Sequence, residues 1–381
     1  MDALQVAHYV WSRLPVLLVF AGGYLVYRLL TVSGLAEAFV RRALSACRGR
    51  ADLLLLAVVG AGMGLSMFIP NAVAALTLVP MLRRLDEDVV DAGGPRLTTP
   101  LTLAAIYGAS IGGMATLIGS PANLLLLGVL DYFQVPGREQ VTFFTWLVWG
   151  LPLALVFGLV AWRVALLALP AEVRRSRWRS GRRSRLPEGV LRPAPPLTPW
   201  QRAAAKLFGL FLGFWTLSAA LGEVWHGYRM YEPACAAGFF AFFCVLLLRP
   251  TGPPCCPDED PLLRPSDVVA DVPWRGLGFL ALIGAVVLCV RLTGLDDAAA
   301  GVLGRALAVA MPHAALLLLL ALAVIFLTEV FSNTLVSAAF FLLAHQLALA
   351  HGADPLPLLI TVSVASTCAF KVVPSGLRSV R

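Results

Sequence analysis

Three adjacent hydrogen-bonding side chains lie in the middle of an apolar stretch of this sequence. Ser332, Asn333 and Thr334 separate the hydrophobic runs 314–331 and 335–349. Polar groups in apolar surroundings need hydrogen-bond partners. Residues of these types are favoured at helix N-termini, where their oxygens accept hydrogen bonds from the free N–H groups of the first turn. The pattern predicts that one helix ends here and that Asn333 and Thr334 cap the next one.

A second apolar stretch, residues 51–82, is interrupted in a similar way by Pro70 and Asn71. Proline cannot continue the hydrogen-bond ladder of an α-helix. One long tilted helix is an alternative here, but we favour a re-entrant hairpin of two half-length arms. At its tip, the unpaired carbonyls of the first arm can replace water around a small cation. The free N–H groups at the start of the second arm favour binding of an anion. In the stretch described first, Asn333 and Thr334 would bind this anion.

A third polar interruption lies in ASIGGMATLIGSPAN, residues 109–123, where glycines, hydroxyls and a proline occur inside an apolar run. We expect an unwound helix whose backbone faces the tip of the first hairpin. Its candidate lining residues are Ser110, Thr116, Ser120 and Asn123. The alternative is a glycine-rich helix that packs closely against a neighbour.

The composition predicts a helical, multi-pass membrane protein. Of the 381 residues 59% are hydrophobic and 14% are charged, whereas soluble domains carry about 25% charged residues. Continuous apolar runs near 20 residues recur along the chain, as in membrane-spanning helices and unlike the alternating strands of a barrel. The net charge of +8 comes from arginines clustered in short connections. This is a topology signal of membrane proteins, so a lipid bilayer and not a nucleic acid is the expected partner.

The chain is expected to divide into eight segments. These are a first span with a cytoplasmic connection (1–50), a first hairpin with an unwound helix (51–130), a span (131–170), an Arg- and Pro-rich cytoplasmic linker (171–202), scaffold spans (203–248), a second cytoplasmic linker (249–273), a second-repeat span with an external connection (274–313), and a second hairpin with part of an unwound helix (314–381). The two hairpin segments would form a transport domain.

The two halves of the sequence resemble one another. LLVFAGGYLVYRLLTVSGLAEA in the first half is similar to LGFLALIGAVVLCVRLTGLDDAA in the second. Gly34 precedes Asn71 by 37 positions, and Gly294 precedes Asn333 by 39. The connection 41–50 carries four arginines, whereas in 291–313 two arginines are offset by two aspartates, which predicts inverted orientations. Inverted repeats with interrupted spans are typical of secondary transporters.

Four motifs resemble the divalent anion–sodium symporter family, whose members carry dicarboxylates, citrate and sulfate. They are FSNTLVSAAFFLL, YGASIGGMATLIGSPANLLL, DVPWRGLGFLALIGA and SVASTCAF. The resemblance covers about residues 17–370. It implies a homodimer with a scaffold domain and a transport domain that moves like an elevator. It also implies a substrate held between two Ser-Asn-Thr hairpin tips, beside sodium ions.

The resemblance also implies a set of binding residues. The expected substrate ligands are Asn71, Ser332, Asn333, Thr334, Ser120 and Asn123. The expected Na+ ligands are Asn71, Ser110, Gly113, Gly119, Ser332, Asn333, Ser366 and Ala369.

This sequence departs from the family pattern at three places. The first tip reads Pro70-Asn71-Ala72 instead of Ser-Asn-Thr. Spans that usually precede residue 16 and follow the second unwound helix are not found, so the chain is expected to be trimmed at both ends. Lys371 lies in the last apolar run, where its ammonium would substitute for a sodium ion or, as we favour, reach the membrane surface.

The sequence therefore predicts Na+-coupled secondary transport of a small divalent anion across the inner or plasma membrane. The alternatives are sodium-independent anion exchange, export of an oxyanion or metalloid, and a truncated family member that does not transport. An enzyme is not expected, because the spans contain no HExxH motif, no Cys/His cluster and no nucleophile with a nearby base. No organic cofactor is expected.

Overall fold

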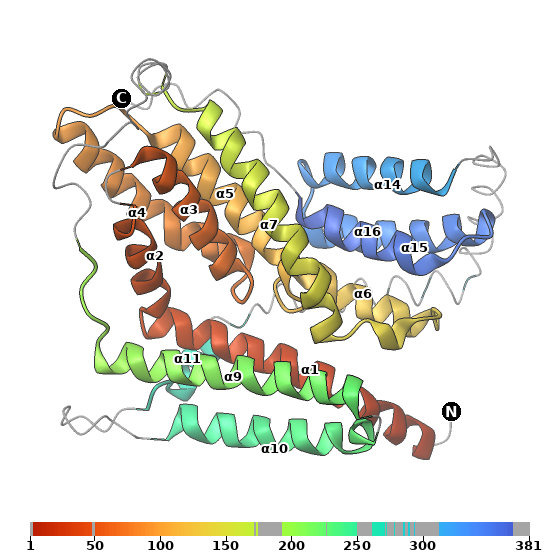
Figure 1. Ribbon diagram of the computed structural model, residues 1–381. Coiled ribbons are helices and arrows are strands. Elements are labelled where there is room, and N and C mark those ends of the chain that lie inside the picture. Colours follow the sequence, from red (N-terminus) through yellow and green to blue (C-terminus); the bar gives the residue numbers. More distant parts are fainter. Residues whose placement is uncertain are drawn as a thin grey trace. The chain divides into compact units, whose positions relative to one another are not determined.

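The computed structural model describes residues 3–47, 50–170, 193–225, 227–249, 261–270 and 312–368, with isolated positions elsewhere. Every regular element in these ranges is a helix (Figure 1), which confirms the all-helical class. Within the described residues, five stretches in helices are long and apolar enough to cross a membrane. They are Trp11–Val32, Phe143–Leu167, Pro199–Gly222, Tyr228–Leu248 and Asn333–Ala350. The span expected within 274–290 lies outside the described residues.

The helices form two compact units. The first unit comprises Met1–Gly119 and Thr142–Asp271. Its described helices are α1 (Ala3–Val32), α2 (Leu35–Ser45), α3 (Ala51–Ser66), α4 (Asn71–Asp91), α5 (Thr98–Ala115), α7 (Phe143–Leu167), α9 (Pro199–Val224), α10 (Tyr228–Leu248) and α11 (Pro265–Ala270).

The second unit comprises Ser120–Val141 and Val272–Arg381. Its described helices are α6 (Pro121–Tyr132), the 3₁₀ helix η1 (Arg138–Gln140), α14 (His313–Thr328), α15 (Asn333–Ala350) and α16 (Pro355–Thr367). Helix α16 packs against α6, α14 and α15. Buried hydroxyl groups of α16 therefore face other helices of this unit.

Close packing of α3 against α5 forms the core of the first unit. Gly108 and Gly112 lie one turn apart on α5 and contact the backbone of α3 at Val59 and Met63. Small residues at this spacing let two helix backbones approach closely. Near the end of α5, the fully buried Trp146 of α7 donates from its indole N–H to the Met114 carbonyl at 2.9 Å. The end of α5 thus contacts both α3 and α7.

The thiol of Cys47, between α2 and α3, leads to a prediction about pH. Cys47 is 3% exposed, and its thiol donates to the Ala43 carbonyl. Burial, and then the nearby Asp52 carboxylate, raises the pKa of this thiol to about 11. The thiolate is the reactive form, so labelling by N-ethylmaleimide should accelerate about tenfold per pH unit between pH 7 and pH 9.

Peptide mass spectrometry measures this labelling at Cys47 alone. Asp52→Asn should lower the pKa of the thiol and speed labelling at a given pH, because a negative neighbour disfavours the thiolate. A labelling rate that does not change with pH would contradict this prediction. It would mean that opening of the structure around Cys47, and not the fraction of thiolate, limits the reaction.

Candidate functional site

The first interruption is the four-residue break Met67–Pro70 between α3 and α4. Asn71 is the first residue of α4, and Ser66 is the last residue of α3. The Ser66 hydroxyl is fully buried and donates to Asn71 Oδ1 at 2.6 Å. The two side chains thus join the end of one arm to the start of the next.

The residues after α5 fold against this first tip. Helix α5 ends at Ala115, and residues 116–120 are not helical. Thr116, which is fully buried, donates from Oγ1 to the Met67 carbonyl. A Cβ atom on Gly113 would lie 2.5 Å from Asn71 Oδ1. The predicted interruption of this helix therefore lies beside the tip, as expected from its glycines.

Several uncharged oxygen atoms converge at this place. A Cβ atom on Gly119 would lie 2.8 Å from the Gly113 carbonyl oxygen and 3.1 Å from that of Ser66. These carbonyls lie close to the Ser66 hydroxyl and Asn71 Oδ1. Carbonyl, amide and hydroxyl oxygens are ligands of hard cations rather than of transition metals. Among the described residues, no group of three His, Cys, Asp or Glu side chains is placed to hold a metal.

The second interruption is the four-residue break Glu329–Ser332 between α14 and α15. The helix cap lies one residue earlier than predicted, because Ser332 Oγ accepts the Leu335 N–H at 3.2 Å. Asn333 and Thr334 occupy the first turn of α15 and are half-buried. The first turn of this 18-residue helix therefore carries a hydroxyl cap followed by an amide and a second hydroxyl.

The two interruptions share a pattern that sequence reasoning missed. Each break has four residues, and each second arm begins with Asn, at Asn71 and at Asn333. A buried hydroxyl residue ends each first arm, Ser66 at 0% exposure and Thr328 at 1%. Each hydroxyl lies five positions before its asparagine. This repeated spacing is the signal in the sequence that could have identified Ser66 and Thr328 as tip residues.

A buried polar cluster links α6 and α16 in the second unit. Ser120 caps α6 by accepting the Ala122 N–H, and the fully buried Asn123 follows. The Ser363 hydroxyl of α16 donates to Asn123 Oδ1 at 2.8 Å, and the Ser366 hydroxyl donates to the Ser363 carbonyl. Ser363 was not among the expected ligands, because a single serine in an apolar helix usually bonds to its own backbone.

The expected site residues thus fall into separate groups. In the first unit, the structure brings Asn71, Gly113 and Gly119 together. Ser110 lies on α5 and is half-buried. In the second unit, Ser363 joins Asn123 to Ser366. Ser332, Asn333 and Thr334 lie together at the start of α15. The expected ligand Ala369 and the possible cation Lys371 lie outside the described residues.

Comparison with known proteins gives a consistent set of similarities. Residues 5–365 match the model of the family described as Citrate transporter, CitMHS. A sodium-dependent dicarboxylate transporter of Staphylococcus saprophyticus is 24% identical over 330 residues, which cover 82% of this chain and 59% of the relative. The sodium-dependent low-affinity dicarboxylate transporter 1 of Caenorhabditis elegans is 25% identical, covering 74% and 50%. Human Na(+)/dicarboxylate cotransporter 3 is 28% identical, covering 69% and 47%. The chain spans about half of the length of these relatives.

Proposed function

Because the chain belongs to the citrate transporter family of divalent anion–sodium symporters, we propose that it carries a small divalent anion across the membrane together with sodium. The family consists of transporters, not enzymes, and the chain is an integral, multi-pass membrane protein. The relatives are named for dicarboxylates, which makes a C4 dicarboxylate or citrate the first substrate to test.

The oxygen cluster at the first tip is the observation that carries this proposal. The Ser66 hydroxyl and Asn71 Oδ1 are 2.6 Å apart, beside the carbonyls of Ser66 and Gly113. Such oxygens replace the hydration shell of a small cation, and interrupted helices in transporters use them for this purpose. We assign sodium binding to this cluster, with Asn71, Gly113 and Gly119 as the expected residues that shape it.

The start of α15 supports binding of the anion. The N-terminus of a helix carries partial positive charge and free N–H groups. Here Ser332 accepts one of these N–H groups, while Asn333 and Thr334 add side-chain donors in the first turn. At the first tip, Pro70 has no N–H and Ala72 no hydroxyl. The proposal is therefore that sodium binds at the first tip and that the second tip makes most of the hydrogen bonds to the anion.

Uptake into liposomes tests the proposal. The purified protein should take up labelled succinate or citrate when sodium is higher outside, and uptake should stop when potassium replaces sodium. Vesicles without protein are the control. Equal uptake with either cation would overturn the coupling to sodium, and uptake only into vesicles preloaded with unlabelled anion would identify an exchanger instead.

A further inference from the structure

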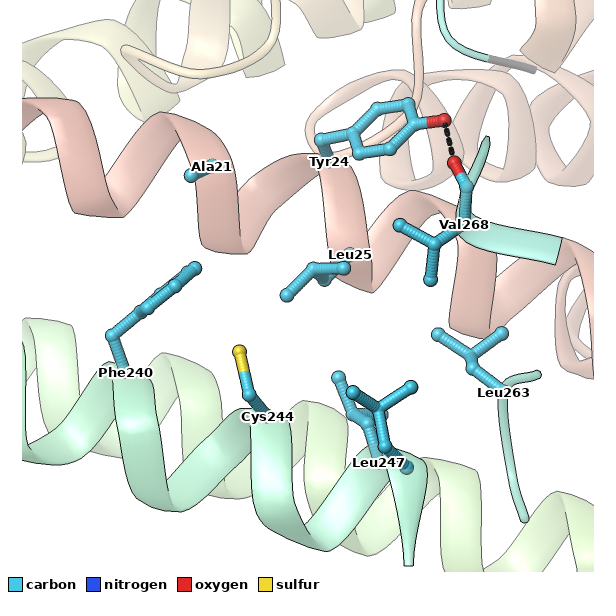
Figure 2. Close-up of a pocket in the computed structure, with 9 residues that line it drawn as sticks. Ala21, Tyr24, Leu25, Phe240, Cys244, Leu247, Leu263 and Val268 are labelled. Atoms are coloured by element: carbon cyan, nitrogen blue, oxygen red, sulfur yellow. Dashed lines mark hydrogen bonds between the residues drawn. The ribbon is translucent and has the colours of Figure 1, made fainter. Parts of the chain in front are cut away.

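The first unit contains an apolar pocket that offers little to an ion. It has a volume of about 300 Å³ and lies between α1 and α10, as Figure 2 shows. The side chains that border it are hydrocarbon apart from the Tyr24 hydroxyl and the Cys244 thiol, and that hydroxyl already donates to the Val268 carbonyl at 2.7 Å. The buried hydroxyl groups of α16 in the second unit, by contrast, make a contact that bears on ion binding.

Helix α16 carries four hydroxyl groups, and one of them bonds to a different helix. Thr361, Ser366 and Thr367 each donate to a carbonyl three or four residues earlier in α16. Such bonds are usual for hydroxyl groups in an apolar helix. Ser363 instead donates to Asn123 Oδ1 at 2.8 Å, and both side chains are fully buried. This bond therefore joins α16 to α6.

Asn123 lies in the first turn of α6, where the chain has just entered the second unit. The chain passes from the first unit to the second between Gly119 and Ser120. Ser120 accepts the Ala122 N–H with its hydroxyl and the Asn123 N–H with its carbonyl, so this turn is capped. Gly119 belongs to the proposed sodium cluster. Asn123 therefore follows that cluster by only four positions in the sequence.

The other partner in the bond, Ser363, lies on the helix that borders the second hairpin. Helix α16 packs against α14 and α15, the two arms that meet at the second tip. Ser366, an expected sodium ligand, donates to the Ser363 carbonyl at 2.8 Å. A displacement of Ser363 therefore moves the helix that contacts both arms.

A buried hydrogen bond is well suited to transmit such a displacement. Apolar contacts are not directional, so helices joined only by them can shift against one another. If α6 and α16 separated, the amide oxygen of Asn123 would lose a donor at a position that is 0% exposed, where water does not replace it. Asn123 and Ser363 should therefore stay together when either helix moves.

We propose that Ser363 is a positioning residue that couples sodium binding to anion binding through its bond to Asn123. This inference rests on the proposed function. Sodium at the first tip would favour the arrangement of α16 and the second hairpin that binds the anion. The anion would favour sodium by the same factor, because coupling between binding sites is reciprocal. Ser363 need not contact either ion for this role.

Thermal unfolding of the purified protein in detergent measures this coupling without transport. Unfolding temperatures are recorded along a succinate titration, once in sodium chloride and once in potassium chloride at the same ionic strength. In the unmodified chain, sodium should lower the succinate concentration for half of the maximal stabilisation about tenfold, a factor typical of coupled sites. In Ser363→Ala this factor should fall to about two or less, while sodium and succinate each still stabilise the protein.

Further variants test whether the bond itself is responsible. Asn123→Ala removes the acceptor and should also reduce the sodium factor. The double variant, Ser363→Ala with Asn123→Ala, should reduce it no further, because both changes remove the same bond. Thr361→Val is the matched control, since the Thr361 hydroxyl lies on α16 but donates to the Pro357 carbonyl at 2.8 Å. This variant should keep the full factor.

A Ser363→Ala protein with a lower unfolding temperature but an unchanged sodium factor would overturn the inference, because the serine would then only stabilise the fold. An equal loss of the factor in Thr361→Val would overturn the role of this particular bond. If neither sodium nor succinate stabilises the unmodified chain, the proposed function itself fails, and the inference fails with it.

Discussion

Asn333→Ala is expected to raise the anion concentration for half-maximal uptake by about 10- to 100-fold, which corresponds to the loss of one or two hydrogen bonds to a charged group. Asn333 lies in the first turn of α15, directly after the Ser332 cap. Its amide adds donors where backbone N–H groups already favour an anion. Removing the amide should therefore weaken anion binding while the sodium dependence changes little.

Asn71→Ala should act on the other ion. Asn71 Oδ1 accepts from the Ser66 hydroxyl and lies beside carbonyl oxygens, so its loss should raise the sodium concentration for half-maximal uptake by about tenfold or more. Thr77→Val is the control, because Thr77 lies further along α4 and its hydroxyl bonds to the Val73 carbonyl.

Initial uptake rates in liposomes, measured as a matrix of sodium and succinate concentrations, separate the two effects. Because transport couples the two ions, each variant should change the half-maximal concentrations of both sodium and succinate. The comparison therefore rests on which of these two concentrations changes more. If both asparagine variants shift the two constants by the same factor, the proposed division between a sodium tip and an anion tip is wrong.

The positions of the two breaks were predictable because they depend on local chemistry. Pro70 cannot extend the helical ladder, and Ser332 provides the cap that a new helix needs. The length of α4 was not predicted, because its apolar stretch ends near Leu82 while the helix continues to Asp91. Its polar end is held by tertiary contacts: the Asp86 carboxylate accepts the Leu97 N–H and the Thr98 hydroxyl.

The contacts that complete the candidate site could not be predicted from local sequence patterns. Ser66 and Ser363 are single hydroxyls in apolar runs, and such residues commonly bond to their own helix. Ser363 instead reaches Asn123, 240 positions away in the sequence. The five-residue spacing of Ser66 to Asn71, repeated in Thr328 to Asn333, is a signal in the sequence that could have identified Ser66, and no such signal marks Ser363.

Among glycine-to-alanine substitutions at the α3–α5 contact, Gly112→Ala should destabilise the first unit most. The added Cβ would lie 2.4 Å from the Met63 carbonyl oxygen and 2.8 Å from Met63 Cα. These are backbone atoms of α3, so the clash is relieved only if the two helices separate. Overpacking of this kind costs about 1–3 kcal/mol, which exceeds the gain of about 1 kcal/mol from replacing glycine in a helix.

Two other glycines in the same helix bundle are matched controls. A Cβ atom on Gly60 of α3 would have no neighbouring atom of the described residues within 4 Å, so Gly60→Ala should stabilise by up to about 1 kcal/mol. At Gly158 on α7 the atom nearest to an added Cβ is Met63 Sδ, at 2.4 Å. A methionine side chain can change its rotamer, so Gly158→Ala should cost less than Gly112→Ala.

Thermal unfolding in detergent ranks the three variants, with Gly112→Ala lowest and Gly60→Ala highest. The clash also reaches the candidate sodium site, because Gly113 follows Gly112 and contacts the Asn71 amide. Gly112→Ala should therefore weaken sodium activation of uptake as well as stability, while Gly60→Ala leaves sodium activation intact. A Gly112→Ala protein with unchanged unfolding temperature would show that α3 and α5 do not pack as closely as their glycines indicate.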